Sequence, residues 1–518
     1  MENKFMRGLR EADNRTLTEN GATTYKSTLS GLMDLFATGA AYRNRSEEDC
    51  IMLFKKAYDE DPVYALKCLF YLHDIREGQG ERRFFKVVYR WLIKYDIEAA
   101  RRNLIYIPFF GRWDNLIYIC YQTKLWDDCL NIIRKQLALD MANLDTGSNY
   151  GISLLSKWMP SINTSSKKTK AVGNEIRKAL DLTPRQYRKT LSILRERINV
   201  LERLMSAGEW DKIEFDKIPS KAGFKYRNAF ARHDIERMKA NKEVVSYKDF
   251  MSDKDTKVNA KDLYPYEVVA QAYNLTKDRN YWPWRQSVEI DSVQRDVVDK
   301  YWDNLKDYFN SCEFDGLCVI DTSGSMWGSE GSAPINVAIS IGLYCAEKAR
   351  GPFAGYYISF SSRPQLIYTA GIDFVDKVER IYKTNLCENT DIEATFDMLL
   401  KTAIRNNCKQ EDIPSSLIIV SDMQFDSARG YYGRNADVRS LMENIERKWN
   451  AYGYKMPRLY FWQVDARNTG GNIPMQLKDG VTFISGFSPS LFQQIMSGKT
   501  AEEFVFDILN SERYAVIK

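Results

Sequence analysis

Apolar side chains recur at helical spacing through the first 310 residues of the chain. This spacing predicts helices over residues 62–72, 82–95, 116–121 and 127–137. Two helix starts carry a capping side chain followed by proline, at Asp61-Pro62 and Thr183-Pro184. No strand pattern lies between the helices, and no strict repeat is visible. We therefore expect an all-α half in which short amphipathic helices stack as hairpins, as in a solenoid.

The pattern changes near Asp315, where a wholly apolar run over 316–320 is typical of a strand buried in a parallel sheet. Further strands are predicted over 354–360, 365–368, 416–420, 459–464 and 481–484. Helices are predicted over 334–350, 392–403, 438–449 and 491–495. This alternation predicts a doubly wound, Rossmann-like α/β domain. The chain thus divides into a helical half, residues 1–310, and an α/β domain, residues 311–518.

The composition is that of an ordinary globular protein, with 44% hydrophobic and 28% charged residues. No apolar run reaches the ~18–20 residues that a membrane-spanning helix needs, so we expect no membrane association. The first residues lack the apolar stretch of a signal peptide. The nine cysteines are scattered and form no C-x-x-C pair, which disfavours a disulfide scaffold or a zinc site. We expect a cytoplasmic protein, in the host cytoplasm or the virion if a virus encodes it.

The two histidines, His73 and His233, each stand alone in a charged helical context. We expect both to be surface or capping residues. So few histidines exclude H-E-x-x-H metalloproteases and multi-histidine metal centres, and leave little room for a Ser-His-Asp triad. Neither a P-loop nor a dinucleotide-binding glycine motif is present. The sequence therefore predicts a protein that is not an enzyme.

The net charge of +5 is distributed unevenly. Residues 311–518 contain 21 Lys and Arg against 25 Asp and Glu, so residues 1–310 carry a net charge of +9. Much of this excess lies in residues 161–240, the basic region, with 19 basic and 10 acidic side chains. Such a region attracts a phosphate backbone, but it is equally compatible with a solvated helical face.

Three oxygen-bearing side chains follow the first strand of the α/β domain in a D-x-S-x-S motif, Asp321, Ser323 and Ser325. Two later loops supply more oxygens, from Thr390 just before a helix and from Asp422 just after a strand. The carboxyl ends of parallel strands share one edge of a sheet, so we expect these loops to meet. Oxygen-only sets suit hard cations, so we expect Mg²⁺ or another divalent cation.

This set resembles the metal-ion-dependent adhesion site of the von Willebrand factor A domain. In that family the first loop carries D-x-S-x-S, the second a threonine and the third an aspartate. The resemblance implies that Ser323, Ser325 and Thr390 bind the metal directly. It also implies that Asp321 and Asp422 act mostly through water.

Such sites leave one coordination position open for an anionic ligand, which implies a protein partner that offers a carboxylate. Asp391, next to the threonine, is expected to cap the following helix or to support the ligands. No general base stands in these motifs to activate a metal-bound water, so we expect docking rather than hydrolysis.

Motifs of the helical half resemble the family known as domain of unknown function 2828. They are Leu17-Thr-Glu-Asn-Gly-Ala22, Asp74-Ile-Arg-Glu-Gly-Gln-Gly-Glu-Arg82, Pro108-Phe-Phe-Gly-Arg-Trp-Asp114, Lys157-Trp-Met-Pro-Ser161, Tyr187-Arg188 with Leu194-Arg195, and Leu263-Tyr-Pro265. That family is similar in layout to the Ro autoantigen (TROVE) proteins, in which HEAT-like helical repeats precede an A domain. Ro-like proteins close their helices into a ring that binds small structured or single-stranded RNA. The layout alone does not establish function.

The basic region itself is compatible with RNA binding. The candidate phosphate contacts are Lys167, Lys168, Lys170, Arg185, Arg188, Lys189, Arg195 and Arg197. Tyr187 offers a ring on which an unpaired base could stack. In the alternative interpretation, Tyr187, Leu191, Leu194 and Ile198 form a core stripe while the basic residues face water.

Two functions from different classes are consistent with the sequence. The first is a Ro-like RNA-binding protein whose A domain docks a protein partner through Mg²⁺. The second is a non-enzymatic scaffold, for example a component of a viral or other large assembly, that acts through protein–protein contacts. Copurified nucleic acid would separate the two.

Overall fold

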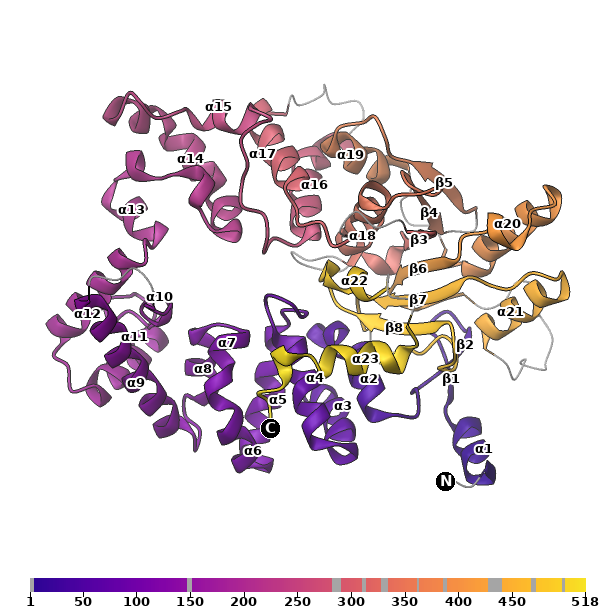
Figure 1. Ribbon diagram of the computed structural model, residues 1–518, viewed down its shortest axis with the longest axis horizontal. Helices are drawn as coiled ribbons and strands as arrows, with labels where there is room; N and C mark the ends of the chain where they lie inside the picture. The colour runs from indigo at the N-terminus through magenta and orange to yellow at the C-terminus, as the bar shows by residue number, and fades with distance from the viewer. Residues whose placement is uncertain are drawn as a thin grey trace.

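The computed structural model describes residues 4–146, 151–281, 290–309, 314–327, 334–360, 363–384, 389–426, 440–466, 472–495 and 499–518. A helix-rich half leads into a C-terminal mixed sheet with parallel strands, as Figure 1 shows. None of the described helices is both long and apolar enough to cross a membrane. The cysteines within the described residues are free.

The helical half consists mainly of short helices that follow one another along an arc (Figure 1). Its α-helices are α1 (Lys4–Asp13), α2 (Gly31–Thr38), α3 (Glu47–Glu60), α4 (Pro62–His73), α5 (Arg82–Tyr95), α6 (Ile97–Asn103), α7 (Ile107–Phe110), α8 (Trp113–Cys120), α9 (Trp126–Asp145), α10 (Leu155–Trp158), α11 (Lys167–Ala179), α12 (Pro184–Arg197), α13 (Leu201–Ala207), α14 (Ser220–Ala240), α15 (Tyr247–Ser252), α16 (Pro265–Tyr281) and α17 (Ser292–Asp303).

Both predicted capping arrangements are confirmed. The Asp61 carboxylate accepts hydrogen bonds from the backbone N–H groups of Val63 and Tyr64, at 2.9 and 3.0 Å, while proline occupies the first position of α4. The Thr183 hydroxyl accepts from the N–H of Gln186 at 3.2 Å at the start of α12. These contacts satisfy N–H groups that have no partner within their own helix.

The expectation that no strands interrupt the helical half is wrong at one place. Strands β1 (Arg15–Leu17) and β2 (Thr23–Tyr25) form a short antiparallel hairpin. This hairpin packs on the C-terminal domain, because Tyr25 exchanges two backbone hydrogen bonds with Ile473, each 3.0 Å long. The Thr18 hydroxyl also donates to the carbonyl of Phe425 at 2.7 Å. Residues near the start of the chain therefore complete the C-terminal domain.

The C-terminal sheet has six strands in the order β5-β4-β3-β6-β7-β8. Its strands are β3 (Gly316–Asp321), β4 (Tyr356–Phe360), β5 (Gln365–Tyr368), β6 (Ser416–Ser421), β7 (Arg458–Gln463) and β8 (Val481–Ser485). The pairings are parallel except that β5 runs antiparallel to β4. Its helices are α18 (Pro334–Lys348), α19 (Phe374–Thr384), α20 (Ile392–Arg405), α21 (Leu441–Ala451), α22 (Phe492–Ile495) and α23 (Ala501–Leu509). The predicted helix over 438–449 corresponds to α21, and its first two residues lie outside the described residues.

Alternate residues of the central strands enter different cores. Ile320 and Val420 belong to a core that is continuous with α18 and with the helical half. Val319 and Ile419 belong to the other core, which α20 and α21 cover. Since successive side chains of a strand point to opposite faces, both faces of the sheet are buried. This explains why the strands of the sequence are continuous apolar runs.

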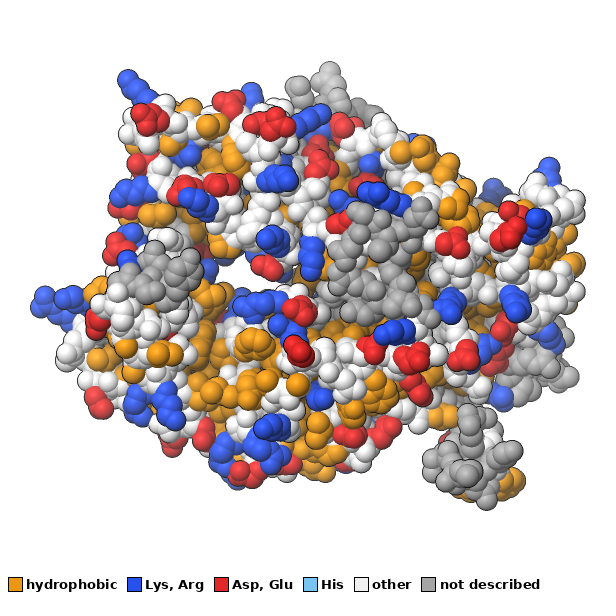
Figure 2. Space-filling model, in the orientation of Figure 1, with side chains coloured by type: hydrophobic (Ala, Val, Ile, Leu, Met, Phe, Trp, Pro, Cys, Tyr) orange, Lys and Arg blue, Asp and Glu red, His pale blue; other side chains and the backbone are white. Residues whose placement is uncertain are grey.

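The helical half bends back on itself and meets the C-terminal domain on both sides. Helix α16 packs on α18 and α19, whereas α2 packs on β8 and α4 on α23. Just before α16, the Tyr264 hydroxyl lies so close to Gly80 that a Cβ there would be 2.5 Å away. Gly80 has a φ of +64°, which also favours glycine. The result is a ring, and Figure 2 shows its opening bordered by Lys and Arg side chains.

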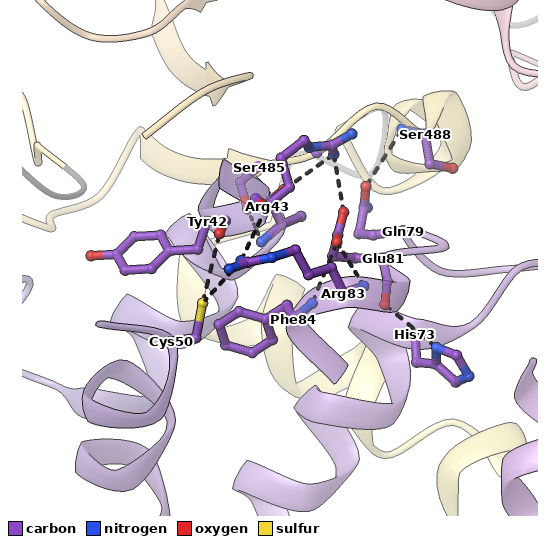
Figure 3. A network of polar contacts seen from close by, with 12 residues as sticks. Tyr42, Arg43, Cys50, His73, Gln79, Glu81, Arg83, Phe84, Ser485 and Ser488 are labelled. Carbon is purple, nitrogen blue, oxygen red and sulfur yellow. Dashed lines mark hydrogen bonds and ion pairs between the residues drawn. The ribbon is translucent and has the colours of Figure 1, made fainter. Parts of the chain in front are cut away.

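Four parts of the chain meet at residues 74–82, the junction segment, which is one of the motifs quoted above. Gln79 donates to the Tyr71 hydroxyl at 2.7 Å and accepts from the N–H of Ser488 at 3.4 Å. Glu81 caps α5 through the N–H of Arg83 and forms an ion pair with Arg43 at 3.5 Å. Figure 3 shows the Gln79 side chain reaching toward the backbone of Ser488 in the sheet domain, with Glu81 and Arg43 beside each other.

The expectation that His73 is a surface or capping residue is wrong. His73 is fully buried, and its ring stacks on Phe85 with centroids 3.9 Å apart. Its Nε2 has no hydrogen-bond partner among the described residues, and Gly111 packs directly against this atom. Burial lowers the pKa of His73 to about 4, so the ring is neutral in the fold.

The neutral state of His73 makes stability depend on pH. The unfolded chain binds a proton at His73 below the ordinary pKa of 6.5, whereas the folded chain does so only below about 4. Above pH 6.5 the free energy of unfolding is therefore not reduced by His73. As the pH falls from 6.5 toward 4, protonation of His73 in the unfolded chain lowers the free energy of unfolding by roughly 3 kcal/mol. We expect H73Q to reduce the fall in melting temperature between pH 7 and pH 5. H233Q is the control, because the His233 side chain is 29% exposed and pairs with Glu236. Equal acid sensitivity of H73Q and the wild type would contradict this assignment.

Candidate metal site and basic surface

The D-x-S-x-S motif lies at the carboxyl edge of the sheet. Asp321 ends β3, and Ser421 ends the neighbouring parallel strand β6. The buried Asp321 carboxylate accepts from the Ser421 hydroxyl at 2.6 Å through Oδ2 and from the N–H of Ser323 at 2.9 Å through Oδ1. The first and third candidate loops therefore meet, as predicted. Ser421 was not among the predicted ligands, although its place just before Asp422 at a strand end was a usable signal.

The two serines of the motif bring their hydroxyls together. The Oγ atoms of Ser323 and Ser325 lie 2.9 Å apart. Adjacent oxygens of an octahedron around Mg²⁺ are separated by about 3.0 Å, since each lies about 2.1 Å from the metal. Ser323 is buried, and Ser325 is partly exposed. The spacing of these hydroxyls therefore fits two neighbouring coordination positions.

The second loop lies beside the third. Thr390 is buried, and its carbonyl accepts from the N–H of Asp426 at 3.0 Å. Asp422 is buried too, and its Oδ1 accepts from the N–H of Gln424 at 3.2 Å. Asp391 caps α20 by accepting from the N–H of Ala394 at 2.9 Å, as expected. All three candidate loops thus lie at one edge of the sheet.

The electrostatic environment of Asp321 is consistent with a cation. Burial raises the pKa of this carboxyl, the hydrogen bonds from Ser323 and Ser421 oppose that increase, and the charge of Asp426 adds to it. A nearby cation would stabilise the ionised form. The described residues contain no group of three or more His, Cys, Asp or Glu side chains placed to hold a metal. The candidate set instead consists of three hydroxyls and two carboxylates, the chemistry of a hard-cation site.

Six of the predicted RNA-contacting cations are exposed on α11 and α12. They are Lys167, Lys168, Lys170, Arg185, Arg188 and Lys189. Arg197 is partly buried. The exposed cations give this side of the arc a positive surface.

The predicted roles of Tyr187 and Arg195 are wrong. Tyr187 is 1% exposed, and its hydroxyl donates to the carbonyl of Pro160 at 2.8 Å, so its ring cannot stack on a base. Arg195 is half-buried and donates to the carbonyls of Ser156 and Met159, at 2.8 and 3.1 Å. Burial also lowers the pKa of its guanidinium. These contacts hold α12 against α10, so the core-stripe interpretation applies to this face of α12.

Comparisons with known proteins identify two families and a viral relative. The sequence profile described as domain of unknown function 2828 matches residues 18–108 and 166–311, and the one described as domain of unknown function 7788 matches residues 315–514. The uncharacterized protein L728 of Acanthamoeba polyphaga mimivirus is 31% identical, over 95% of this chain and 86% of the relative. Among solved structures, the RO (RSR) protein of Deinococcus radiodurans aligns with a TM-score of 0.45 at 13% identity, covering 94% of this chain and 100% of that one. The predicted resemblance to the first family is confirmed.

Proposed function

The chain belongs to the family described as domain of unknown function 2828, and on this basis we propose that it is a non-enzymatic, Ro-like RNA-binding ring. In this proposal the C-terminal domain is a von Willebrand factor A domain that docks a protein partner through Mg²⁺. The RNA is small and structured, or single-stranded.

The observation that carries the RNA proposal is the row of exposed cations on α11 and α12. Among them, Arg185, Arg188 and Lys189 make no hydrogen bond or ion pair within the described part of the chain. Uncompensated cations on a helical surface attract a phosphate backbone and release its counterions on binding. Because Tyr187 is buried, the proposal rests on phosphate contacts and not on stacking at that ring.

The A-domain proposal rests on the geometry of the sheet edge. Ser323, Ser325 and Thr390 would hold the metal directly, with Asp321 and Asp422 contributing through water. A bound Mg²⁺ would supply positive charge and one open position for a partner's carboxylate. The Asp321 carboxylate orients the motif by accepting from Ser323 and Ser421.

The metal proposal predicts that Ser323→Ala combined with Ser325→Ala abolishes Mg²⁺ binding. Each change removes one of two hydroxyls that are 2.9 Å apart. The melting temperature of the double variant is measured beside it, because Ser323 is buried. Isothermal titration calorimetry with MgCl₂ measures the affinity. S415A is the control, since Ser415 lies at the opposite end of β6 and donates to Asp315. Unchanged Mg²⁺ affinity in the double variant, or no binding by the wild type, would overturn the assignment.

The RNA proposal predicts a specific salt dependence. For single-stranded RNA, log affinity should fall linearly with log salt, by about 0.7 for each phosphate contacted. The combined variant R185E, R188E and K189E should reduce this slope by about 2 as well as weaken binding. Fluorescence anisotropy at several salt concentrations measures both quantities.

Two controls make this test specific. K401E, R405E and K409E reverse three exposed cations of the sheet domain and should leave RNA affinity nearly unchanged. Y187F removes one buried hydrogen bond and should lower stability without affecting the salt slope. If the wild type and the R185E, R188E and K189E variant bind RNA with the same weak affinity, and this affinity does not change with salt, the scaffold function replaces the RNA function.

A further inference from the structure

A cavity of about 700 Å³ lies in the helical half where three helices begin. Its lining includes residues at the starts of α5, α8 and α11, and Tyr266 near the start of α16 borders it. The lining cations are Arg43, Arg82, Arg83, Lys86 and Lys168. Of these, only Lys168 lies in the basic region, so the sequence pattern did not reveal this site.

The carboxylates of the cavity are already neutralised. Glu81 caps α5 and pairs with Arg43. Asp114 is held by both Nε and Nη2 of Arg112. In contrast, Arg82, Lys86 and Lys168 make no hydrogen bond or ion pair within the residues that the structure describes. The cavity therefore carries uncompensated positive charge.

Two of these cations repel each other. Burial lowers the pKa of Lys86, the positive charges of Lys168 and Arg90 lower it further, and the negative charge of Glu47 opposes them in part. Lys86 and Lys168 both line the cavity, although their helices are separated by more than 70 residues. An anion between them would remove the repulsion.

The starts of α8 and α11 add to the positive field, whereas the Glu81 carboxylate already caps α5. Helices α5, α8 and α11 have 14, 8 and 13 residues, and each places its N-terminal turn at the lining. The N-terminal ends of helices carry partial positive charge, which favours phosphate groups. Three uncompensated cations and the starts of α8 and α11 match a phosphate monoester, with a charge of about −2, better than a singly charged diester.

We propose that this cavity binds a phosphate monoester attached to a nucleoside, and that its source is the terminal phosphate of an RNA strand. The second part rests on the RNA function proposed above. The volume accommodates a nucleotide beside the phosphate, and Tyr118 and Tyr266 offer partly exposed rings on the lining. A free nucleotide has the same chemistry, so the experiment separates the two sources.

The first arm measures uridine 5′-monophosphate, uridine and inorganic phosphate by calorimetry with the full-length chain. We expect the monophosphate to bind at least about tenfold more tightly than uridine. K86Q with K168Q should abolish that difference. Because these lysines repel each other, the melting temperature of this variant should be equal or higher. K94Q with K178Q, at the opposite ends of α5 and α11, is the matched control and should bind as the wild type does.

The second arm compares one RNA octamer carrying a 5′-phosphate, a 3′-phosphate or neither. Tighter binding of a phosphorylated form by about tenfold, lost in K86Q with K168Q, supports the terminal-phosphate source. If the three octamers bind with equal affinity, the terminal phosphate is not recognised and this inference is wrong, whereas the proposed RNA function still stands. If the chain binds the monophosphate but not RNA, the cavity remains a phosphate monoester site, and the proposal that the phosphate comes from an RNA strand is wrong. Equal binding of the monophosphate by the wild type and the double variant overturns the cavity itself.

Discussion

A buried ion pair joins the end of the chain to the junction segment, and the closure of the ring depends on it. Asp74 is fully buried, and its carboxylate accepts two hydrogen bonds from Arg513 and one from the Tyr514 hydroxyl at 3.0 Å. A buried carboxylate that loses its partner costs about 3–5 kcal/mol. The residues after α23 are therefore fixed on α4, although 439 positions of sequence separate Asp74 from Arg513.

The same segment positions the rest of the ring. After Asp74, Gln79 contacts the sheet domain, and the backbone turns at Gly80, which packs against the Tyr264 hydroxyl. Glu81 then caps α5. A side chain at Gly486, where φ is +109°, would overlap Gln79, so the two halves touch without space between them. Because α5 starts here, the junction segment also orients Arg82 and Lys86 toward the cavity. Ring closure and the proposed phosphate site therefore share one support.

Features determined by local chemistry could be predicted from the sequence, whereas those created by distant contacts could not. The Asp61 cap, the strand over 365–368 and the meeting of Asp321 with the third loop follow from neighbouring residues and strand order. The hairpin β1–β2 has strands too short to show alternation, and it pairs with Ile473 from the other end of the chain. Periodicity allowed Tyr187 to lie in the apolar stripe of α12, but it could not show that the Tyr187 hydroxyl donates to the carbonyl of Pro160. The burial of His73 likewise depends on Phe85 and Gly111.

The claim that the junction segment closes the ring is tested most directly by hydrogen exchange, measured by mass spectrometry, in Arg513→Gln. If the ion pair with Asp74 supports the closure, exchange should increase together in three separate stretches: residues 74–82, residues 486–491 of the sheet domain and residues 264–266 before α16. Each of these stretches contacts the junction segment, and Tyr266 also packs on Phe487 with ring centroids 5.0 Å apart. A joint increase therefore reports the loss of closure. An increase confined to residues 510–518 would show that the ion pair fixes only the end of the chain, and it would contradict this account.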